Sequence, residues 1–236
     1  MNAPTIITDI PATIDPQELM PRLHLRPGSP MAAEFLALAE QAQRIARPKA
    51  AYLIGYIDDK TDDTVVIDGV RFTSRVLRVN LDPVHRVFAY IATCGLELYE
   101  WAASLDDVLH QFWAEELKAA VLREATARVF DAIAAHNQGK MASMNPGSLP
   151  DWPLPEQRPF FRLMGDAPAA IGVSLNDSCL MTPNKSVTGF RFANESSYVN
   201  CQLCPREGCP GRAAPYDAAL FAQRYAEHAT DEVGEV

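Results

Sequence analysis

Three cysteines gather on one short stretch near the end of the chain. The segment C-Q-L-C-P-R-E-G-C-P-G-R runs from Cys201 to Arg212 and spaces its thiols as C-x2-C-x4-C, in a chain that has 5 cysteines in all. Thiolates are the preferred ligands of structural zinc and of iron–sulfur clusters, and three of them on one loop can reach a single centre. The spacing therefore predicts a metal centre with Cys201, Cys204 and Cys209 as ligands.

A fourth ligand is needed to complete a tetrahedral zinc site or a four-iron cluster, and the remaining cysteines are Cys94 and Cys179. Cys94 ends an apolar run, where a free cysteine usually packs as a small hydrophobe. We predict strands on both sides of the segment 186–192, so that Cys179 and Cys201 lie opposite Thr188 from its two sides, roughly 9 to 10 Å apart. That separation fits two corners of an iron–sulfur cube better than one zinc ion, so Cys179 is the expected fourth ligand.

Two Cys-Pro steps, Cys204-Pro205 and Cys209-Pro210, favour a four-iron, four-sulfur (4Fe-4S) cluster over zinc, because a Cys-Pro step also ends the ferredoxin cysteine run. Two alternatives stay open: a zinc ion that only staples the C-terminal loop, and three reduced thiols without a metal. Arg206 and Arg212 would lower the cost of a negatively charged cluster and so tune its potential.

Composition limits the classes of function. The chain has 236 residues, 48% of them hydrophobic, and a formal net charge of -9. This acidity argues against nucleic acid as a partner and favours a protein partner with a basic face. We expect no membrane partner and a cytoplasmic location, because the sequence has no 18-residue apolar run and no basic, apolar signal peptide at its start. Thiols stay reduced in that compartment, which favours metal binding over disulfides.

Hydrophobic periodicity predicts a mixture of helices and strands. Helical spacing indicates a helix at 31–46, a long one at about 106–135 with Asp106 as N-cap, and shorter ones at 156–164 and 214–228. Strands are expected at 50–56, in a hairpin around Asp68-Gly69 that continues to residue 81, and at 87–94, 171–181, 186–192 and 197–201. Proline-rich residues 140–155 are expected to form a loop. We divide the chain at residue 140, into halves 1–140 and 141–236 of one continuous domain.

Residues 145–192 contain a series of unusual steps in a fixed order: N-P-G-S-L-P-D-W-P-L-P-E-Q, then F-F-R-L-M-G, then I-G-V-S-L-N-D-S-C-L-M-T-P-N-K-S-V-T-G-F-R-F. This stretch resembles the activation domain of cobalamin-dependent methionine synthase. That family has a Pro-Gly-Tyr loop, an acidic and glutamine-bearing helix start, Ile-Gly-Val-x-Leu-Thr-x-Ser, Met-x-Pro, and Ser-Val-Ser-Gly before an aromatic strand. The corresponding residues here are Pro146-Gly147, Glu156-Gln157, Ile171 to Ser178, Met181 with Pro183, and Ser186 to Gly189.

The resemblance implies an α+β fold with a twisted antiparallel sheet and flanking helices, in a C-shaped or helmet-like domain. It also implies a role beside a corrinoid cofactor. In the synthase, the domain binds S-adenosylmethionine and presents it to inactive cob(II)alamin, which is reduced and remethylated.

The chain departs from the family at its ligand loop, which has the form Arg-x-x-x-Gly-Tyr. The arginine position falls on Ser143 and the tyrosine position on Ser148. Serine cannot form the two parallel hydrogen bonds that an arginine makes to a carboxylate, which argues against S-adenosylmethionine binding. A later family tyrosine has a counterpart in Tyr198, three residues before Cys201, so the predicted metal site adjoins the region where the relatives bind their ligand.

Together these features predict a reductive activator or electron relay that serves a corrinoid protein or corrinoid methyltransferase and draws on a low-potential electron donor. The predicted ligands of the 4Fe-4S cluster are Cys179, Cys201, Cys204 and Cys209. Asn145, Gly147, Trp152 and Ser186 would line the surface that faces the cobalamin of the partner. One alternative is a zinc-stapled assembly module without redox chemistry, and another is an S-adenosylmethionine-binding reactivation domain that uses Tyr198. Simpler roles are a turn at Gly147 and a local hydrophobic anchor at Trp152.

Overall fold

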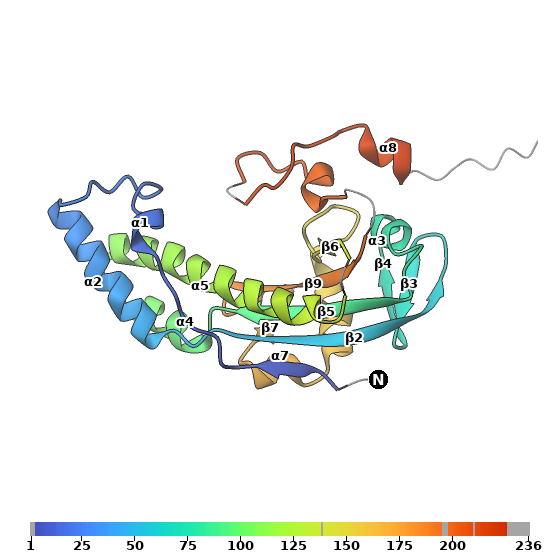
Figure 1. Cartoon of the computed structure of the whole chain (residues 1–236), viewed down its shortest axis with the longest axis horizontal. Helices are drawn as coiled ribbons and strands as arrows, with labels where there is room; N and C mark the ends of the chain where they lie inside the picture. Colours follow the sequence, from blue (N-terminus) through green and yellow to red (C-terminus); the bar gives the residue numbers. More distant parts are fainter. Residues whose placement is uncertain (1–2, 138, 195–197, 210, 226–236) are drawn as a thin grey trace, which may run out of the picture.

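The computed structural model describes residues 3–137, 139–194, 198–209 and 211–225. Its centre is a seven-stranded sheet in the order β4-β3-β2-β5-β9-β6, with β1 beside β2 (Figure 1). Every pair of neighbouring strands in this sheet is antiparallel. The strands are β1 (Thr5–Ile7), β2 (Lys49–Lys60), β3 (Thr64–Ile67), β4 (Val70–Thr73), β5 (Arg86–Thr93), β6 (Met141–Met144) and β9 (Ser186–Ala193). The α+β fold class with an antiparallel sheet and flanking helices is confirmed.

Helices flank this sheet, and the longest of them, α5, runs along one of its faces (Figure 1). The helices are α1 (Pro16–Leu19), α2 (Pro30–Ile45), α3 (Arg75–Asn80), α4 (Leu96–Ala103), α5 (Val108–Ala134), α6 (Gln157–Met164), α7 (Ala167–Ala170) and α8 (Leu220–Arg224), with 3-10 turns η1 (Leu154–Glu156) and η2 (Asn200–Leu203). None of the described helices combines the length and the apolar composition that a bilayer span requires.

Alternation along β2 and β5 builds a core on each face of the sheet. Ala50, Tyr52, Phe88 and Tyr90 pack against α5, while Ala51, Leu53, Val87 and Ala89 face the other way. The second face is covered by α3, α6 and the loop after β6. A further apolar cluster joins α2, α4 and the first half of α5.

The segment 76–81, expected to continue a hairpin strand, is helical. Ser74 accepts a hydrogen bond from Leu77 N at 3.0 Å and caps α3, and the Asp151 carboxylate accepts from Arg75 N and Val76 N. The long helix was expected to start at Asp106, but its N-cap is Asp107, whose carboxylate accepts from the backbone N–H groups of Leu109 and His110. These hydrogen bonds lower the pKa of Asp107.

The expected strand 171–181 is also wrong. Asn176 accepts a hydrogen bond from Leu180 N at 2.9 Å, and the chain folds back there into a separate two-stranded sheet, β7 (Ser174–Leu175) with β8 (Met181–Thr182). The described part of the expected strand 197–201 contains no strand, and its last two residues belong to the 3-10 turn η2. Residue 197 lies outside the described residues. Residues 226–228 of the expected last helix also lie outside them; the described part of that helix is α8.

These corrections remove the argument from strand register. Thr188 of β9 pairs with Ile91 of β5, and on the other side β9 pairs with β6, so Cys179 and Cys201 do not flank Thr188 on neighbouring strands. The same pairing shows that residues on both sides of position 140 contribute to one sheet, because β9 lies between β5 and β6.

Candidate functional site

The loop that follows β6 is held against β9 by side-chain hydrogen bonds. The amide nitrogen of Asn145 donates to Tyr90 Oη at 2.8 Å and to the carbonyl oxygen of Thr188 at 2.6 Å. This approach is possible because position 189 is a glycine: a Cβ there would lie 2.5 Å from Asn145 Nδ2. Burial raises the pKa of Tyr90 to about 12, although the hydrogen bond from Asn145 acts in the opposite direction.

Gly147 makes the sharp turn of this loop. Its φ is 83°, a left-handed conformation that favours glycine, and an added Cβ would lie 2.9 Å from Leu154 Cδ1. Its backbone N–H donates to the carbonyl oxygen of Trp152 at 2.8 Å. The turn function that we considered for Gly147 is therefore present.

The loop also joins the segment that follows β9. Ser148 donates to the carbonyl oxygen of Asn145 and accepts from Asn200 Nδ2 at 3.0 Å. Asn200 Oδ1 in turn accepts from the hydroxyl of Tyr198 at 3.0 Å. We call this group of residues, Asn145, Gly147, Ser148, Tyr198 and Asn200, the loop junction. Sequence reasoning selected Asn145, Gly147 and Tyr198, and it missed Asn200, whose position follows from η2 rather than from a motif.

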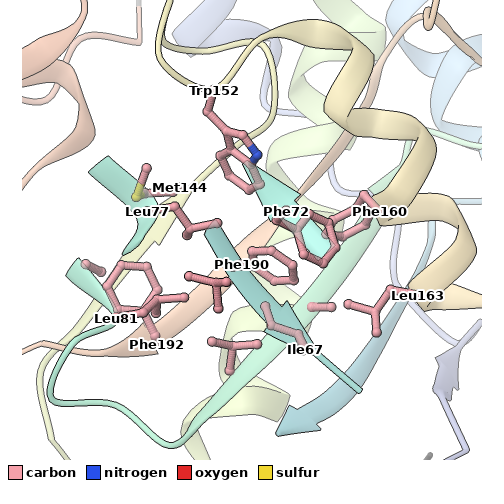
Figure 2. Close-up of a cluster of buried hydrophobic side chains, with 14 of the residues drawn as sticks. Ile67, Phe72, Leu77, Leu81, Met144, Trp152, Phe160, Leu163, Phe190 and Phe192 are labelled. Carbon is pink, nitrogen blue, oxygen red and sulfur yellow. The ribbon is translucent and has the colours of Figure 1, made fainter. Parts of the chain in front are cut away.

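Trp152 lies beneath the loop rather than on its surface. Its ring is fully buried and stacks on Phe190 with 5.6 Å between the ring centroids (Figure 2). Phe72 and Phe160 also pack on Phe190, at 5.0 and 5.4 Å between centroids. This packing is that of a local hydrophobic anchor, the simpler of the two roles considered for Trp152.

Ser186 is separate from the loop junction. It starts β9 and donates to Thr93 Oγ1 at 2.9 Å, at the end of β5.

Ser143, which takes the place of the family's arginine, accepts a hydrogen bond from Arg191 of β9 at 3.2 Å. The described structure thus brings an arginine of another strand to position 143.

An apolar cavity of about 430 Å³ adjoins the loop junction. It lies between the loop after β6, the start of α3 and the segment after β9. Two aromatic rings of its lining are about half exposed, Tyr216 at 51% and Phe221 at 42%. The lining residues are Val76, Leu149, Pro150, Asp151, Leu203, Pro205, Tyr216 and Phe221.

The segment with three cysteines is tied together by one arginine. The Arg212 guanidinium donates to the carbonyl oxygens of Cys201 and Cys204 at 3.0 Å each, and also to those of Arg206 and Ala214. All three cysteines of the segment are free and partly exposed, and Cys201 Sγ accepts from Ala213 N at 3.4 Å.

The other two cysteines are buried. Cys179 has a φ of 62° and lies in the turn between β7 and β8, where its N–H donates to the Asn176 carbonyl oxygen at 3.0 Å. Cys94 belongs to the apolar cluster of α2, α4 and α5, and burial raises its pKa to about 12. Across the described ranges, no three His, Cys, Asp or Glu side chains lie close enough to hold a metal ion.

No protein-family model matches this chain, and no curated protein does so either. A solved structure does match: the crystal structure of the MetH reactivation domain bound to AdoHcy, with a TM-score of 0.60 at 14% sequence identity. The alignment covers 83% of this chain and 80% of that chain. The protein therefore has the fold of the methionine synthase reactivation domain, which confirms the fold expected from residues 145–192.

Proposed function

We propose that this protein supports the reactivation of a corrinoid-dependent methyltransferase by docking beside the corrinoid of that partner. The supporting observation is the fold, which matches a reactivation domain over most of both chains. Fold alone does not determine function. The proposal therefore also relies on the loop junction, which links the two segments that the sequence resemblance assigns to the ligand region.

In the form of this proposal that the comparison supports best, the protein also binds an adenosyl ligand of the AdoHcy class. The matched domain was solved with AdoHcy. The cavity of about 430 Å³ beside the loop junction falls within the range of roughly 300 to 1,000 Å³ that is usual for small-molecule sites. Phe221 and Tyr216 offer aromatic faces on which an adenine ring would stack, and the buried residues Leu149 and Leu203 offer apolar walls.

Titration calorimetry with AdoHcy tests this form. Phe221→Ala should weaken AdoHcy binding by about tenfold, since one base–aromatic stack is worth ~1–3 kcal/mol. The matched control is Phe112→Ala, because Phe112 is similarly exposed but lies on α5, outside the cavity lining. Absence of binding to the unsubstituted chain would exclude the adenosyl ligand and leave the docking proposal to be tested by itself.

The cysteine segment favours a second form, in which the protein carries an iron–sulfur cluster. Three thiols on one segment are the correct kind of donor for such a cluster or for zinc. Cys201, Cys204 and Cys209 would hold it after moving together, because no three such side chains are gathered among the described residues. Cys179 stays our proposal for the fourth ligand, with Cys94 as the alternative, but without the support of a strand register. When bound, a cluster would supply single electrons at low potential. In the protein itself, Arg212 holds the backbone of the segment, and its positive charge would offset the negative charge of thiolate ligands.

Anaerobic purification followed by iron, zinc and sulfide analysis tests the second form. Iron and sulfide in a ratio near one, lost in Cys204→Ser, would support it. Loss in Cys179→Ser with retention in Cys94→Ala would identify Cys179 as the fourth ligand, and the reverse pattern would identify Cys94. One zinc ion without sulfide would favour the zinc-stapled assembly module instead. A metal-free protein that binds AdoHcy would exclude the cluster and retain the adenosyl form.

A further inference from the structure

A second cavity, of about 550 Å³, opens where the start of β5 meets the ends of α3 and β9 and the residues after α5. It lies outside the loop junction and shares no residue with the apolar cavity beside that junction. Its lining comes from distant parts of the chain: Val79, Asn80, Pro83, Val84, His85, Arg86, Phe88, Asn137, Ala193, Asn194 and Arg224.

The charge of this lining is opposite to that of the whole chain. Arg86, Arg224 and His85 are among the lining residues, and no Asp or Glu is among those that the structure describes. The chain as a whole carries a formal net charge of -9. Arg86 has no acidic neighbour among the described residues of this lining, so it creates a local positive potential in the hollow that attracts anions.

Arg86 is held in place by contacts that leave much of its donor capacity for a ligand. One terminal nitrogen donates to the carbonyl oxygen of His136 at 2.8 Å, and the guanidinium lies 5.6 Å from the centroid of the Phe88 ring. A guanidinium carries five N–H donors, so this bond uses only part of them. The planar fork of the remaining donors fits the two oxygens of a carboxylate or a phosphate.

Asn80 provides a buried donor in the same lining. Its side-chain oxygen accepts from the hydroxyl of Tyr225 at 3.1 Å, and its amide nitrogen donates to the sulfur of Met144 at 3.6 Å. The residue is only 4% exposed. A thioether sulfur is a weak acceptor, so this buried amide in the lining makes only a weak hydrogen bond within the protein.

Arg191 strengthens the positive potential near this end of the sheet. It lies two residues before Ala193 on β9, so both side chains leave the same face of the strand. Its guanidinium carbon lies 4.1 Å from the Phe130 ring centroid, and its Nε is buried without a hydrogen-bond partner in the described structure.

The rest of the lining is apolar. Val84 and Phe88 are buried, and Val79 and Pro83 complete the apolar walls. We propose that this cavity binds a small organic oxyanion, a carboxylate or a phosphate monoester with an apolar body. The oxyanion would lie against Arg86, and the apolar body would contact Phe88, which lies on the same face of β5.

Titration calorimetry with benzoate, phenyl phosphate, inorganic phosphate and benzyl alcohol tests the proposal. At least one of the first two should bind at least tenfold more tightly than inorganic phosphate, which lacks the apolar body, and than benzyl alcohol, which lacks the charge. Whether benzoate or phenyl phosphate binds more tightly distinguishes a carboxylate from a phosphate ester.

Variants locate the site. Arg86→Gln should weaken binding of the better ligand about tenfold or more, and His85→Glu should weaken it through repulsion. Both residues are exposed, so neither substitution removes a core contact. Arg71→Gln is the control, because Arg71 is an exposed arginine of β4 outside the lining and should leave the affinity unchanged. Failure of both organic anions to bind, or equal affinity in Arg86→Gln and the unsubstituted chain, would overturn the proposal.

Discussion

The loop junction and the cysteine segment meet at Asn200 and Cys201, but they are stabilised in different ways. In the loop junction, several side chains bond to one another above a fully buried Trp152. In the cysteine segment, one side chain, Arg212, makes most of the described bonds that tie the segment together, and the thiols are partly exposed. The first region is therefore organised by several side chains, whereas the described order of the second depends mainly on one.

Removal of the anchor of the loop junction should have the largest effect. Trp152→Ala leaves a cavity beneath the loop and should lower the free energy of unfolding by ~3–5 kcal/mol, as large-to-small core substitutions do. Urea denaturation measures this change. Phe112→Ala is the control, because Phe112 is 57% exposed and its loss should cost less than ~0.5 kcal/mol. Equal effects of the two substitutions would contradict the anchor function.

Steric crowding at position 189 should have the next largest effect. In Gly189→Ala, the new Cβ would approach Asn145 Nδ2 to 2.5 Å and the Met144 carbonyl oxygen to 2.6 Å. Because one of these atoms belongs to the backbone, we expect a loss of ~1–3 kcal/mol in stability. Gly211→Ala, in the cysteine segment, meets no atom within 4 Å and should be close to neutral. If Gly189→Ala left the free energy of unfolding unchanged, the loop junction could move to accommodate the new Cβ, and the crowding argument would be wrong.

Alkaline pH should affect the loop junction through Tyr198. Burial, followed by the nearby Tyr225, raises the pKa of Tyr198 above its usual 10. A group with a raised folded pKa contributes stability below its unfolded pKa, and this contribution is lost as the pH rises above about 10. Over that window the unsubstituted chain should lose up to ~1.4 kcal/mol per pH unit more than Tyr198→Phe. Parallel curves of stability against pH above 10 would contradict the burial of this hydroxyl.

Loss of Arg212 should have the smallest effect on global stability and a local effect on the thiols. Arg212→Gln removes the bonds to the carbonyl oxygens of Cys201 and Cys204, so the segment should open more often. We expect the three partly exposed thiols to react several-fold faster with a disulfide reagent, with little change in the urea midpoint. Arg206→Gln is the control, because the described bond at Arg206 uses its backbone carbonyl oxygen. Unchanged thiol reactivity in Arg212→Gln would show that the segment has other support.

Sequence patterns predicted the elements whose periodicity is long or strong. The helices around 31–46 and 106–135 and the strands at 87–94 and 186–192 occur with shifts of one or two residues. The errors occur where a single side chain redirects the backbone: Ser74 begins a helix in a segment rich in valine and leucine, and Asn176 folds back an expected strand. Such local hydrogen bonds compete with strand pairing and leave little trace in hydrophobic periodicity.

The candidate site was predictable only in part. Gly147 and Tyr198 followed from the family resemblance, and the cysteine spacing identified the segment that Arg212 ties together. Gly189 was part of the family match, but its close approach to Asn145 could not be predicted, and Asn200 was not selected at all, because both depend on contacts between β9, the loop after β6 and η2. The proposed partner of the cysteine segment, Cys179, rested on a strand register that the structure does not have.

The most direct test of the proposed function uses the corrinoid methyltransferases of the source organism, prepared with their cofactor as cob(II)alamin. Purified chain should be added under anaerobic conditions with a low-potential reductant and S-adenosylmethionine, while the visible spectrum is followed. We predict that the chain binds one of these proteins and speeds the loss of the cob(II)alamin band at least tenfold over the reductant alone. If none of them binds the chain or changes its rate of reactivation, the proposed reactivation function is wrong.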